Sequence, residues 1–218
     1  MNQIASTIPT IETDTWIKAS WETFAALADD PVYEKGRFYY DRGHLRIEMA
    51  ALGSAHGQDN TVISNVVAIF AALRNFRTKG LTNASFWKTG VRGCQPDIAF
   101  YVGTNFGRLP HNNSPVNIDE FGAPNLVIEI GASSFKDDLG DKRLLYEQLG
   151  VQEYWVVKVE TSEVFAFEVN QGYSGRIQES LVLPRLKISL VEEALQRSRT
   201  EDDGTINRWL LQTFADPS

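Results

Sequence analysis

The sequence predicts an α/β (α+β) fold in which a mixed β-sheet is flanked by helices. Its 218 residues, 43% of them hydrophobic and 22% charged, are enough to bury a proper core. Short runs rich in β-branched and aromatic residues alternate along the chain with longer segments of helical periodicity. We therefore expect one domain over residues 16–218 with a helical extension at its C-terminal end. Residues 1–15 are polar and threonine-rich, and are predicted to form an N-terminal arm.

The N-terminal part of the domain should contain a helix and a β-hairpin. The helix is predicted over residues 16–28 and ends because Asp30-Pro31 follows it as a breaker. Two strand-like runs come next, at residues 37–40 and 45–50. The four residues between them, 41–44, have the sequence DRGH, which is typical of a tight hairpin turn.

A long helix is predicted from His56 to Phe76, because apolar residues recur there at steps of three and four: Ile63, Val66, Val67, Phe70 and Leu73. Lys79-Gly80 should end it. Strands are predicted next over residues 84–88, 97–102 and 126–130. The segment 103–123 is rich in glycine, asparagine and proline and is too long for an ordinary connection, so it is either a functional flap or a mobile insertion.

The C-terminal third continues the alternation of helices and strands. A helix is expected over residues 138–149, closed by Gly150. The elements predicted after it are strands over 153–159, 164–169 and 180–183, and helices over 191–197 and 205–214.

Composition restricts both the compartment and the type of metal site. No apolar run approaches the roughly 18 residues of a membrane span, and the N-terminus lacks the features of a signal peptide, so we expect a cytoplasmic protein with no membrane partner. The single cysteine, Cys94, excludes an intramolecular disulfide and a thiolate-rich zinc site. Any metal ion must therefore be held by oxygen or imidazole ligands.

The formal net charge of −7 argues against a protein that binds nucleic acid mainly by neutralising phosphates. Clustered carboxylates that hold metal ions would contribute to this charge, and a basic groove can coexist with an acidic remainder. The central part of the chain is locally basic, with Arg74, Arg77, Lys79, Lys88 and Arg92.

Two carboxylates are predicted to converge on the sheet. Asp97 begins one predicted strand and Glu129 is the penultimate residue of the next. If these strands pair antiparallel, as consecutive strands usually do, the start of one lies beside the end of the other. Glu129 shares its face with Val127, among β-branched residues, where an unpaired charge is costly. A metal ion or a lysine would satisfy it.

The helix after Glu129 offers that lysine. On a helical wheel Lys142 lies on the same stripe as Leu145 and Tyr146, with Asp138 at the edge of the stripe, so Lys142 should point at the sheet, towards Glu129. The alternative is that Asp138 caps the helix while Lys142 reaches solvent or forms a surface ion pair with it. His56 shares an inward face of the long helix and is expected to assist the site without binding metal.

The order of these motifs resembles the Uma2 family (DUF820) of restriction-endonuclease-like proteins. The resemblance rests on PDIAFYV at 96–102 and on PNLVIEIGASSFKDDLGDKRLLYEQLGVQEYWVVK at 124–158, with a looser match in YYDRGHLRIEMAALGSAHG at 39–57. It implies a PD-(D/E)XK nuclease core, a mixed sheet flanked by helices.

The resemblance also implies roles for matching residues. Asp97 would be the aspartate of the PD motif and Glu129 the acidic residue of the second half-motif, and both would bind Mg²⁺ or Mn²⁺. Two residues after Glu129 stands Gly131 instead of the lysine, so Lys142 would take the role of that lysine. Where many members have a glutamate in the hairpin this chain has Tyr39, and Glu48 is the nearest acidic residue.

The function predicted from these residues is hydrolysis of phosphodiester bonds in DNA by a metal-dependent endonuclease. Its catalytic residues would be Asp97, Glu129 and Lys142, supported by residues around them: His56, Asp138, Tyr146 and Glu48. Cutting both strands needs two sites, which favours a homodimer. Two alternatives remain open at this point: a binding or assembly module that keeps the nuclease fold without cutting, and a hydrolase of a small phosphorylated substrate.

Overall fold

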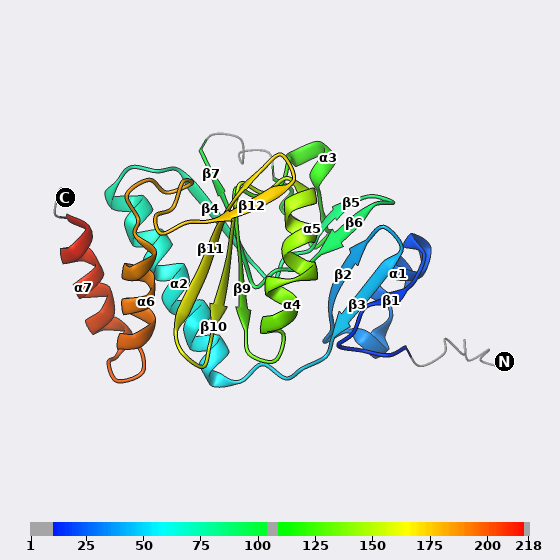
Figure 1. Ribbon diagram of the computed structural model, residues 1–218, viewed down its shortest axis with the longest axis horizontal. Coiled ribbons are helices and arrows are strands. Elements are labelled where there is room, and N and C mark those ends of the chain that lie inside the picture. The colour runs from blue at the N-terminus through cyan, green and yellow to red at the C-terminus, as the bar shows by residue number, and fades with distance from the viewer. Residues whose placement is uncertain (1–10, 104–108, 216–218) are drawn as a thin grey trace.

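Two six-stranded sheets form the framework of the protein, and the computed structural model describes residues 11–103 and 109–215 of it (Figure 1). The central sheet contains, in spatial order, β12 (Tyr173–Arg176), β11 (Glu163–Asn170), β10 (Glu153–Lys158), β9 (Leu126–Gly131), β7 (Ile98–Val102) and β4 (Thr78–Thr82). The outer sheet contains β1 (Ile17–Lys18), β3 (His44–Glu48), β2 (Arg37–Asp41), β6 (Arg92–Cys94), β5 (Phe86–Lys88) and β8 (Val116–Asn117). Both sheets are mixed, because β9 and β10 pair parallel, as do β5 and β8, and the other pairs are antiparallel.

Helices cover the sheets in layers. One face of the central sheet is covered by α2 (Ser54–Leu73) and α6 (Ile188–Arg197), on which α7 (Asp203–Ala215) packs, and its other face by α4 (Phe135–Leu139) and α5 (Asp141–Leu149). The outer sheet lies beyond α5 and carries α1 (Trp21–Ala28) on its far face (Figure 1). The short α3 (Ile118–Phe121) follows β8, and a 3₁₀ turn, Pro31–Tyr33, follows α1. This arrangement confirms the predicted mixed α/β fold.

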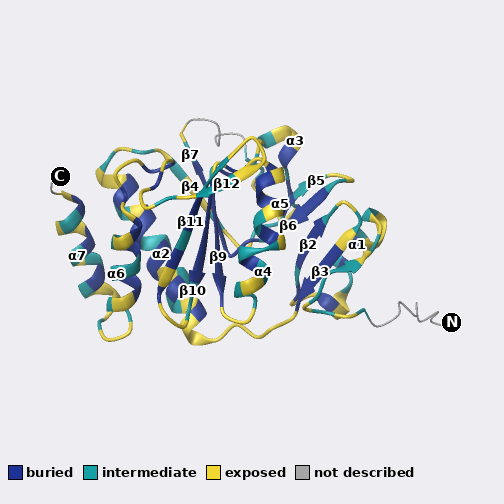
Figure 2. Cartoon of the chain, viewed as in Figure 1, coloured by how far each residue is buried: buried dark blue, intermediate teal, exposed yellow. Residues whose placement is uncertain are grey.

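Strand β9 is the centre of this framework and is buried along its whole length (Figure 2). Because side chains alternate across a strand, Leu126, Ile128 and Ile130 face α2, α6 and α7, and Val127 faces α5. Glu129 shares the α5 face with Val127. As predicted, β7 pairs antiparallel with β9, with Ile98 opposite Ile128. Parallel pairing with β10 requires a crossover, which α4 and α5 supply.

The predicted β-hairpin of the outer sheet is confirmed. Arg42 and Gly43 both have positive φ angles, 42° and 94°, as a tight two-residue hairpin turn requires. The turn sets the register of β2 and β3, so Arg37 lies opposite Glu48. Arg37, Arg46 and Glu48 thus share the face directed at the central sheet, and the apolar residues of the hairpin pack under α1.

Several predicted boundaries were wrong for physical reasons. Residues 180–183 form no strand, because the backbone N–H groups of Leu181 and Val182 donate to the buried carboxylate of Glu153 instead of to a neighbouring strand. Lys79 and Gly80 do not end a helix but lie within β4. The helix expected over 138–149 is divided at Gly140 into α4 and α5.

The N-terminal segment also differs from expectation. Residues 17–18 form β1, so the first helix begins at Trp21 instead of residue 16. Of the expected arm 1–15, residues 1–10 lie outside the described part, while Asp14 donates its N–H to the carbonyl of Ile47 at 2.8 Å.

Within the segment 103–123, residues 104–108 are not described, and β8 and α3 account for part of the rest. Among the described helices none is long and apolar enough to span a membrane.

We predict that α1 can approach the outer sheet only because residue 93 is glycine. A Cβ there would lie 2.4 Å from the Cζ of Phe24, so Gly93→Ala forces the helix or the ring to move. The expected loss of unfolding free energy is about 1–3 kcal/mol, as for other overpacked cores, measured by denaturant unfolding. Gly57→Ala is the control, since nothing lies within 4 Å of its added Cβ. Equal stability of both variants would contradict the prediction.

Candidate functional site

The predicted site residues meet near the C-terminal end of β9 and the start of α2, where His56 contacts Asp97 and the carbonyl oxygen of Ile130. We call this group the acidic cluster. Its carboxylates are Glu48, Asp97, Glu129, Asp137 and Asp138, and its cations are Arg37, Arg46 and Lys142. The members come from both sheets, from α4 and from α5. The cluster therefore exists only when the outer sheet is docked on the central layer.

Asp97 and Glu129 lie near each other on one guanidinium group. Arg37 Nη1 contacts Asp97 Oδ1 and is 3.9 Å from Glu129 Oε2. The second nitrogen, Nη2, is 3.0 Å from Glu48 Oε2. Asp97 Oδ2 also accepts a hydrogen bond from the backbone N–H of Ile130 at 2.7 Å. The structure thus brings Glu48 beside the two carboxylates predicted to bind metal.

Lys142 points inward and its side chain is fully buried. Its Nζ lies 2.7 Å from Glu48 Oε1 and 2.8 Å from Asp138 Oδ1, and 4.0 Å from the ring centre of Tyr39. The ion pair with Asp138 is the i,i+4 pair of the alternative interpretation, but it is buried instead of solvated. The lysine was expected to point towards Glu129. Its ion pairs are with Glu48 and Asp138, and its charge acts on Glu129 over a longer distance.

His56 and Tyr146 both contact the predicted metal ligands. His56 Nε2 is 3.1 Å from Asp97 Oδ1, while its Nδ1 is 3.1 Å from the carbonyl oxygen of Ile130. The hydroxyl of Tyr146 donates to Glu129 Oε1 at 2.6 Å. Each of these side chains contacts one carboxylate, so His56 can orient Asp97 and Tyr146 can orient Glu129.

Three members of the cluster were missed from the sequence: Arg37, Arg46 and Asp137. Arg46 Nε is 3.0 Å from Glu48 Oε1 and 3.2 Å from Asp137 Oδ2. The alternation of the hairpin strands contained a usable signal, because Arg46 and Glu48 are two residues apart and must share a face. Asp137 offered no such signal, because it lies one residue before the helix predicted over 138–149 and was therefore not on the helical wheel.

Gly131 explains why no lysine stands two residues after Glu129. A Cβ at this position would lie 2.6 Å from Asp138 Oδ2 and 2.9 Å from the Cα of Phe135. Helix α4 thus packs directly against the end of β9 and leaves no room for a side chain. A lysine that serves this site must come from another element, and Lys142 on α5 has an ammonium group among the same carboxylates.

Burial and neighbouring charge set the protonation of the cluster. Burial raises the pKa of Glu129 to about 8, a shift that Lys142 opposes and Asp97 reinforces. Asp97 is also buried, but its hydrogen bond with His56 and the charge of Arg37 lower its pKa. The pKa of Lys142 is raised, because Glu129, Asp138 and Glu48 outweigh the burial that would lower it. Lys142 therefore keeps its positive charge.

The charges of the cluster leave room for a divalent cation. Five carboxyl groups face three Lys and Arg cations, so the cluster can take up further positive charge when Glu129 gives up its proton. Oxygen donors of this kind suit Mg²⁺ and Mn²⁺. Among the described residues, Glu48, Asp137 and Asp138 form a group of three whose ligand oxygens all lie within 4.8 Å of one another, and this group does not include the predicted ligands Asp97 and Glu129. A small cavity of about 50 Å³ opens onto the cluster through residues including Arg37, Glu48 and His56.

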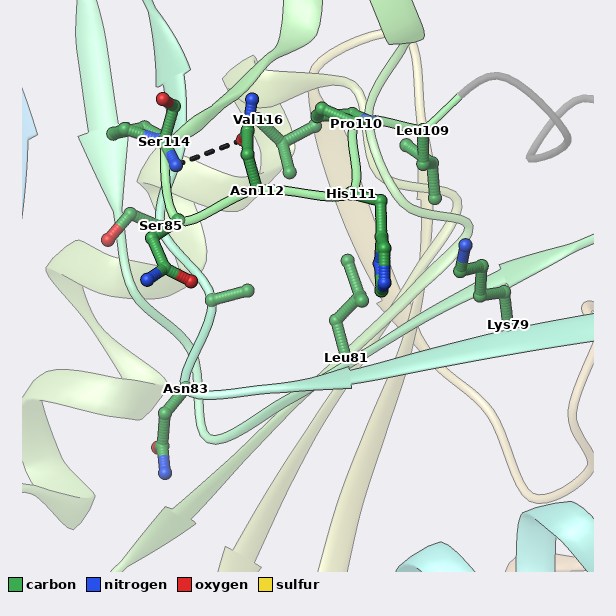
Figure 3. Close-up of a pocket in the computed structure, with 13 residues that line it drawn as sticks. Lys79, Leu81, Asn83, Ser85, Leu109, Pro110, His111, Asn112, Ser114 and Val116 are labelled. Carbon is green, nitrogen blue, oxygen red and sulfur yellow. Dashed lines mark hydrogen bonds between the residues drawn. The ribbon is translucent and has the colours of Figure 1, made fainter.

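A separate cavity of about 330 Å³ lies between β4 and the segment 109–116 (Figure 3). The side chain of His111 points into it between Leu81 and Lys79 (Figure 3). Among the described residues that line it there is no carboxylate and no member of the acidic cluster. It therefore does not offer the oxygen ligands of a divalent metal site.

The raised pKa of Glu129 predicts how stability depends on pH. Between its ordinary value of 4.5 and about 8, the folded protein keeps a proton that the unfolded chain releases, so the unfolding free energy falls as pH rises. Glu129→Gln has no such proton to lose. Its melting temperature relative to wild type should therefore rise from pH 5 to pH 8, by roughly 2–4 °C for each kcal/mol. Thermal melting curves of both proteins, recorded in EDTA at each pH, measure this difference. The exposed Glu120→Gln is the control, and a constant difference for Glu129→Gln contradicts the prediction.

Comparisons with known proteins bear on the fold and the family. A profile of the Uma2 family, described as "Putative restriction endonuclease", matches residues 21–203. The crystal structure of "a putative nuclease belonging to DUF820" from Anabaena variabilis ATCC 29413 superimposes with a TM-score of 0.53 at 17% sequence identity, covering 81% of this chain and 99% of that one. No curated protein matches. At this identity the structural likeness shows the fold, and the family profile, which spans most of the chain, shows the family. The chain belongs to the Uma2 family.

Proposed function

We propose that this protein is a metal-dependent endonuclease that hydrolyses phosphodiester bonds in DNA. The observation that carries the proposal is the convergence of Asp97, Glu129 and Glu48 beside a small cavity, within a cluster in which carboxyl groups outnumber cations. The description of the Uma2 family and that of the Anabaena protein support a nuclease. Clustered carboxylates are also the usual way in which proteins hold the hard cations that phosphodiester hydrolysis uses.

Asp97 and Glu129 would bind Mg²⁺ or Mn²⁺, with Glu48 as the third carboxylate. Such an ion, when bound, stabilises charge on the scissile phosphate and makes a coordinated water more acidic. The guanidinium of Arg37 lies against these three carboxyl groups and would have to withdraw from them. The cavity beside Arg37 provides space for that movement, and a guanidinium released there is suited to a phosphate oxygen.

Lys142 would assist the attacking water as a hydrogen-bond donor. Because its raised pKa keeps it protonated, it cannot accept the proton of that water. It can orient the water and neutralise charge on the phosphate. Asp138 and Glu48 hold the ammonium in place at 2.8 and 2.7 Å. His56 and Tyr146 would orient Asp97 and Glu129 through the contacts described above.

A non-cleaving module is the second candidate, and Arg37 favours it. A guanidinium already satisfies Asp97 and Glu48 in the structure, and a protein that kept this arrangement permanently would need no metal ion. This candidate keeps the fold and the cluster but has no role for Lys142 beyond stability.

We expect metal-dependent nicking of supercoiled plasmid, lost in two conservative variants. Asp97→Asn removes a metal ligand and Lys142→Met removes the ammonium with little change of shape. Each should lower the cleavage rate by at least about 100-fold, as for other groups that stabilise transition-state charge. Plasmid and single-stranded DNA are incubated with Mg²⁺, Mn²⁺ or EDTA, and products are resolved on gels.

Two controls separate chemistry from folding. Lys187→Met changes an exposed lysine outside the cluster and should leave cleavage unchanged. Circular dichroism and calorimetric titration with Mn²⁺ show whether each variant is folded and binds metal. Unchanged cleavage by Lys142→Met would overturn its role. Metal binding without cleavage of DNA, RNA or nucleotides would select the non-cleaving module.

A cytoplasmic homodimer completes the proposal, because cleavage of both strands requires two sites. Helix α7 offers a contact surface, since Leu211 on it is 47% exposed. Light scattering should give twice the mass of the chain. Leu211→Glu should reduce that mass to one chain if α7 is the interface, whereas a monomeric wild type would contradict the dimer.

A further inference from the structure

A large cavity adjoins the small cavity that opens onto the acidic cluster. It has a volume of about 550 Å³, within the range of about 300–1,000 Å³ typical of ligand sites, and its lining includes Phe135, Lys136, Lys158 and Glu160. Ala132 and Ser133 line both this cavity and the small one that opens onto the cluster. The two hollows are thus neighbours on either side of the loop that follows β9. We call the larger one the basic groove.

The two lysines of the groove stand close to the proposed ligands along the chain. In the parallel pairing of β9 with β10, Lys158 lies opposite Gly131, two residues after Glu129. Lys136 is in the first turn of α4, two residues before the cluster member Asp138. Both positions are set by the same elements that build the cluster, so the spacing between groove and cluster is fixed by the fold.

The charges of the groove are available to a ligand. Neither lysine forms an ion pair within the part of the chain that the structure describes, whereas Arg37, Arg46 and Lys142 in the neighbouring cluster are all paired. Lys136 is exposed and Lys158 half-buried. The only carboxylate among the described lining residues is Glu160. An anion entering this groove meets two cations that have no other ionic partner among the described residues.

Aromatic rings lie beside these cations. Lys158 Nζ is 5.6 Å from the ring centre of Phe135, which packs edge-to-face on Phe165 at 5.4 Å. Arg176 continues the row, with its guanidinium 4.5 Å from the ring of Phe165. Phe135 and Phe165 are both only half-buried. Alternating cations and accessible rings are the pattern by which proteins hold single-stranded nucleic acid, the cations on phosphates and the rings on unpaired bases.

We infer that the basic groove binds a nucleic-acid strand next to the acidic cluster, with Lys136 and Lys158 on its phosphates and Phe135 against a base. The biological role of this binding rests on the proposed function. Its test does not, because binding measured in EDTA requires neither metal nor cleavage. The groove also answers the objection raised by the net charge of −7, since the contact surface can be basic while the chain as a whole is acidic.

Fluorescence anisotropy with labelled single-stranded oligothymidylate, in EDTA at several salt concentrations, tests the inference. Each phosphate contact adds about 0.7 to the slope of log affinity against log salt for single strands. The double variant Lys136→Gln/Lys158→Gln should therefore lower the slope by roughly 1.4 and weaken binding at least about tenfold at 50 mM salt. The matched control Lys35→Gln/Lys187→Gln removes the same charge from two exposed positions outside the groove and should change neither value by as much.

Two further variants test the groove more sharply. Phe135→Leu should weaken binding of the single strand about tenfold and of a duplex less, because a paired base cannot stack on the ring. Glu160→Gln removes the opposing charge and should tighten binding. Oligouridylate in parallel shows whether the strand is DNA or RNA. Failure of the wild type to bind any of these probes, or equal losses in the groove and control double variants, overturns the inference.

Cleavage assays on the same proteins keep this inference apart from the proposed function. Binding through the groove without cleavage by the wild type would retain the groove and reject the endonuclease. Cleavage by a wild type whose affinity does not depend on Lys136 and Lys158 would retain the endonuclease and reject the groove.

Discussion

The burial of five carboxylates around three cations is the constraint on which the rest of this structure depends. An unpaired buried carboxylate costs several kcal/mol, so each must meet a cation or a donor before the core can close. Arg37 on the outer sheet reaches Asp97 and Glu129 on the central layer, and Lys142 on α5 reaches Glu48 on the outer sheet. These pairs cross the junction in both directions. They therefore fix how the two sheets lie relative to each other. Apolar packing alone would fix this arrangement less specifically.

Local periodicity was sufficient to predict that two members of this cluster, Glu129 and Lys142, point inward. Period-two alternation placed Glu129 on the α5 face of its strand, and the helical wheel placed Lys142 on the buried stripe. Both conclusions use residues within a few positions of each other. The partner of Asp97 could not be found in this way, because Arg37 lies 60 residues earlier and belongs to the other sheet. The sequence thus indicated that Glu129 and Lys142 turn inward, but not which charges they would meet.

The wrong strand at residues 180–183 has the same origin. The three consecutive apolar residues at 181–183 made this segment look like a strand, but Glu153, which is distant in sequence, accepts its N–H groups and the hydroxyl of Ser180. A buried carboxylate that needs donors competes directly with a neighbouring strand that needs them. Buried charge therefore explains both the cluster and the most distinct departure from the predicted elements. In each case the missing information was a long-range polar contact.

The position of the lysine follows from the packing of α4. If a side chain stood at residue 131, α4 would have to move away from the end of β9, because Asp138 and Phe135 occupy that space. Such a movement would also remove Asp138 from Lys142, which it now holds at 2.8 Å. A lysine on the strand and a lysine on α5 are thus mutually exclusive solutions. This chain uses the second, and the glycine that departs from the PD-(D/E)XK pattern is the residue that makes the alternative position of the ammonium possible.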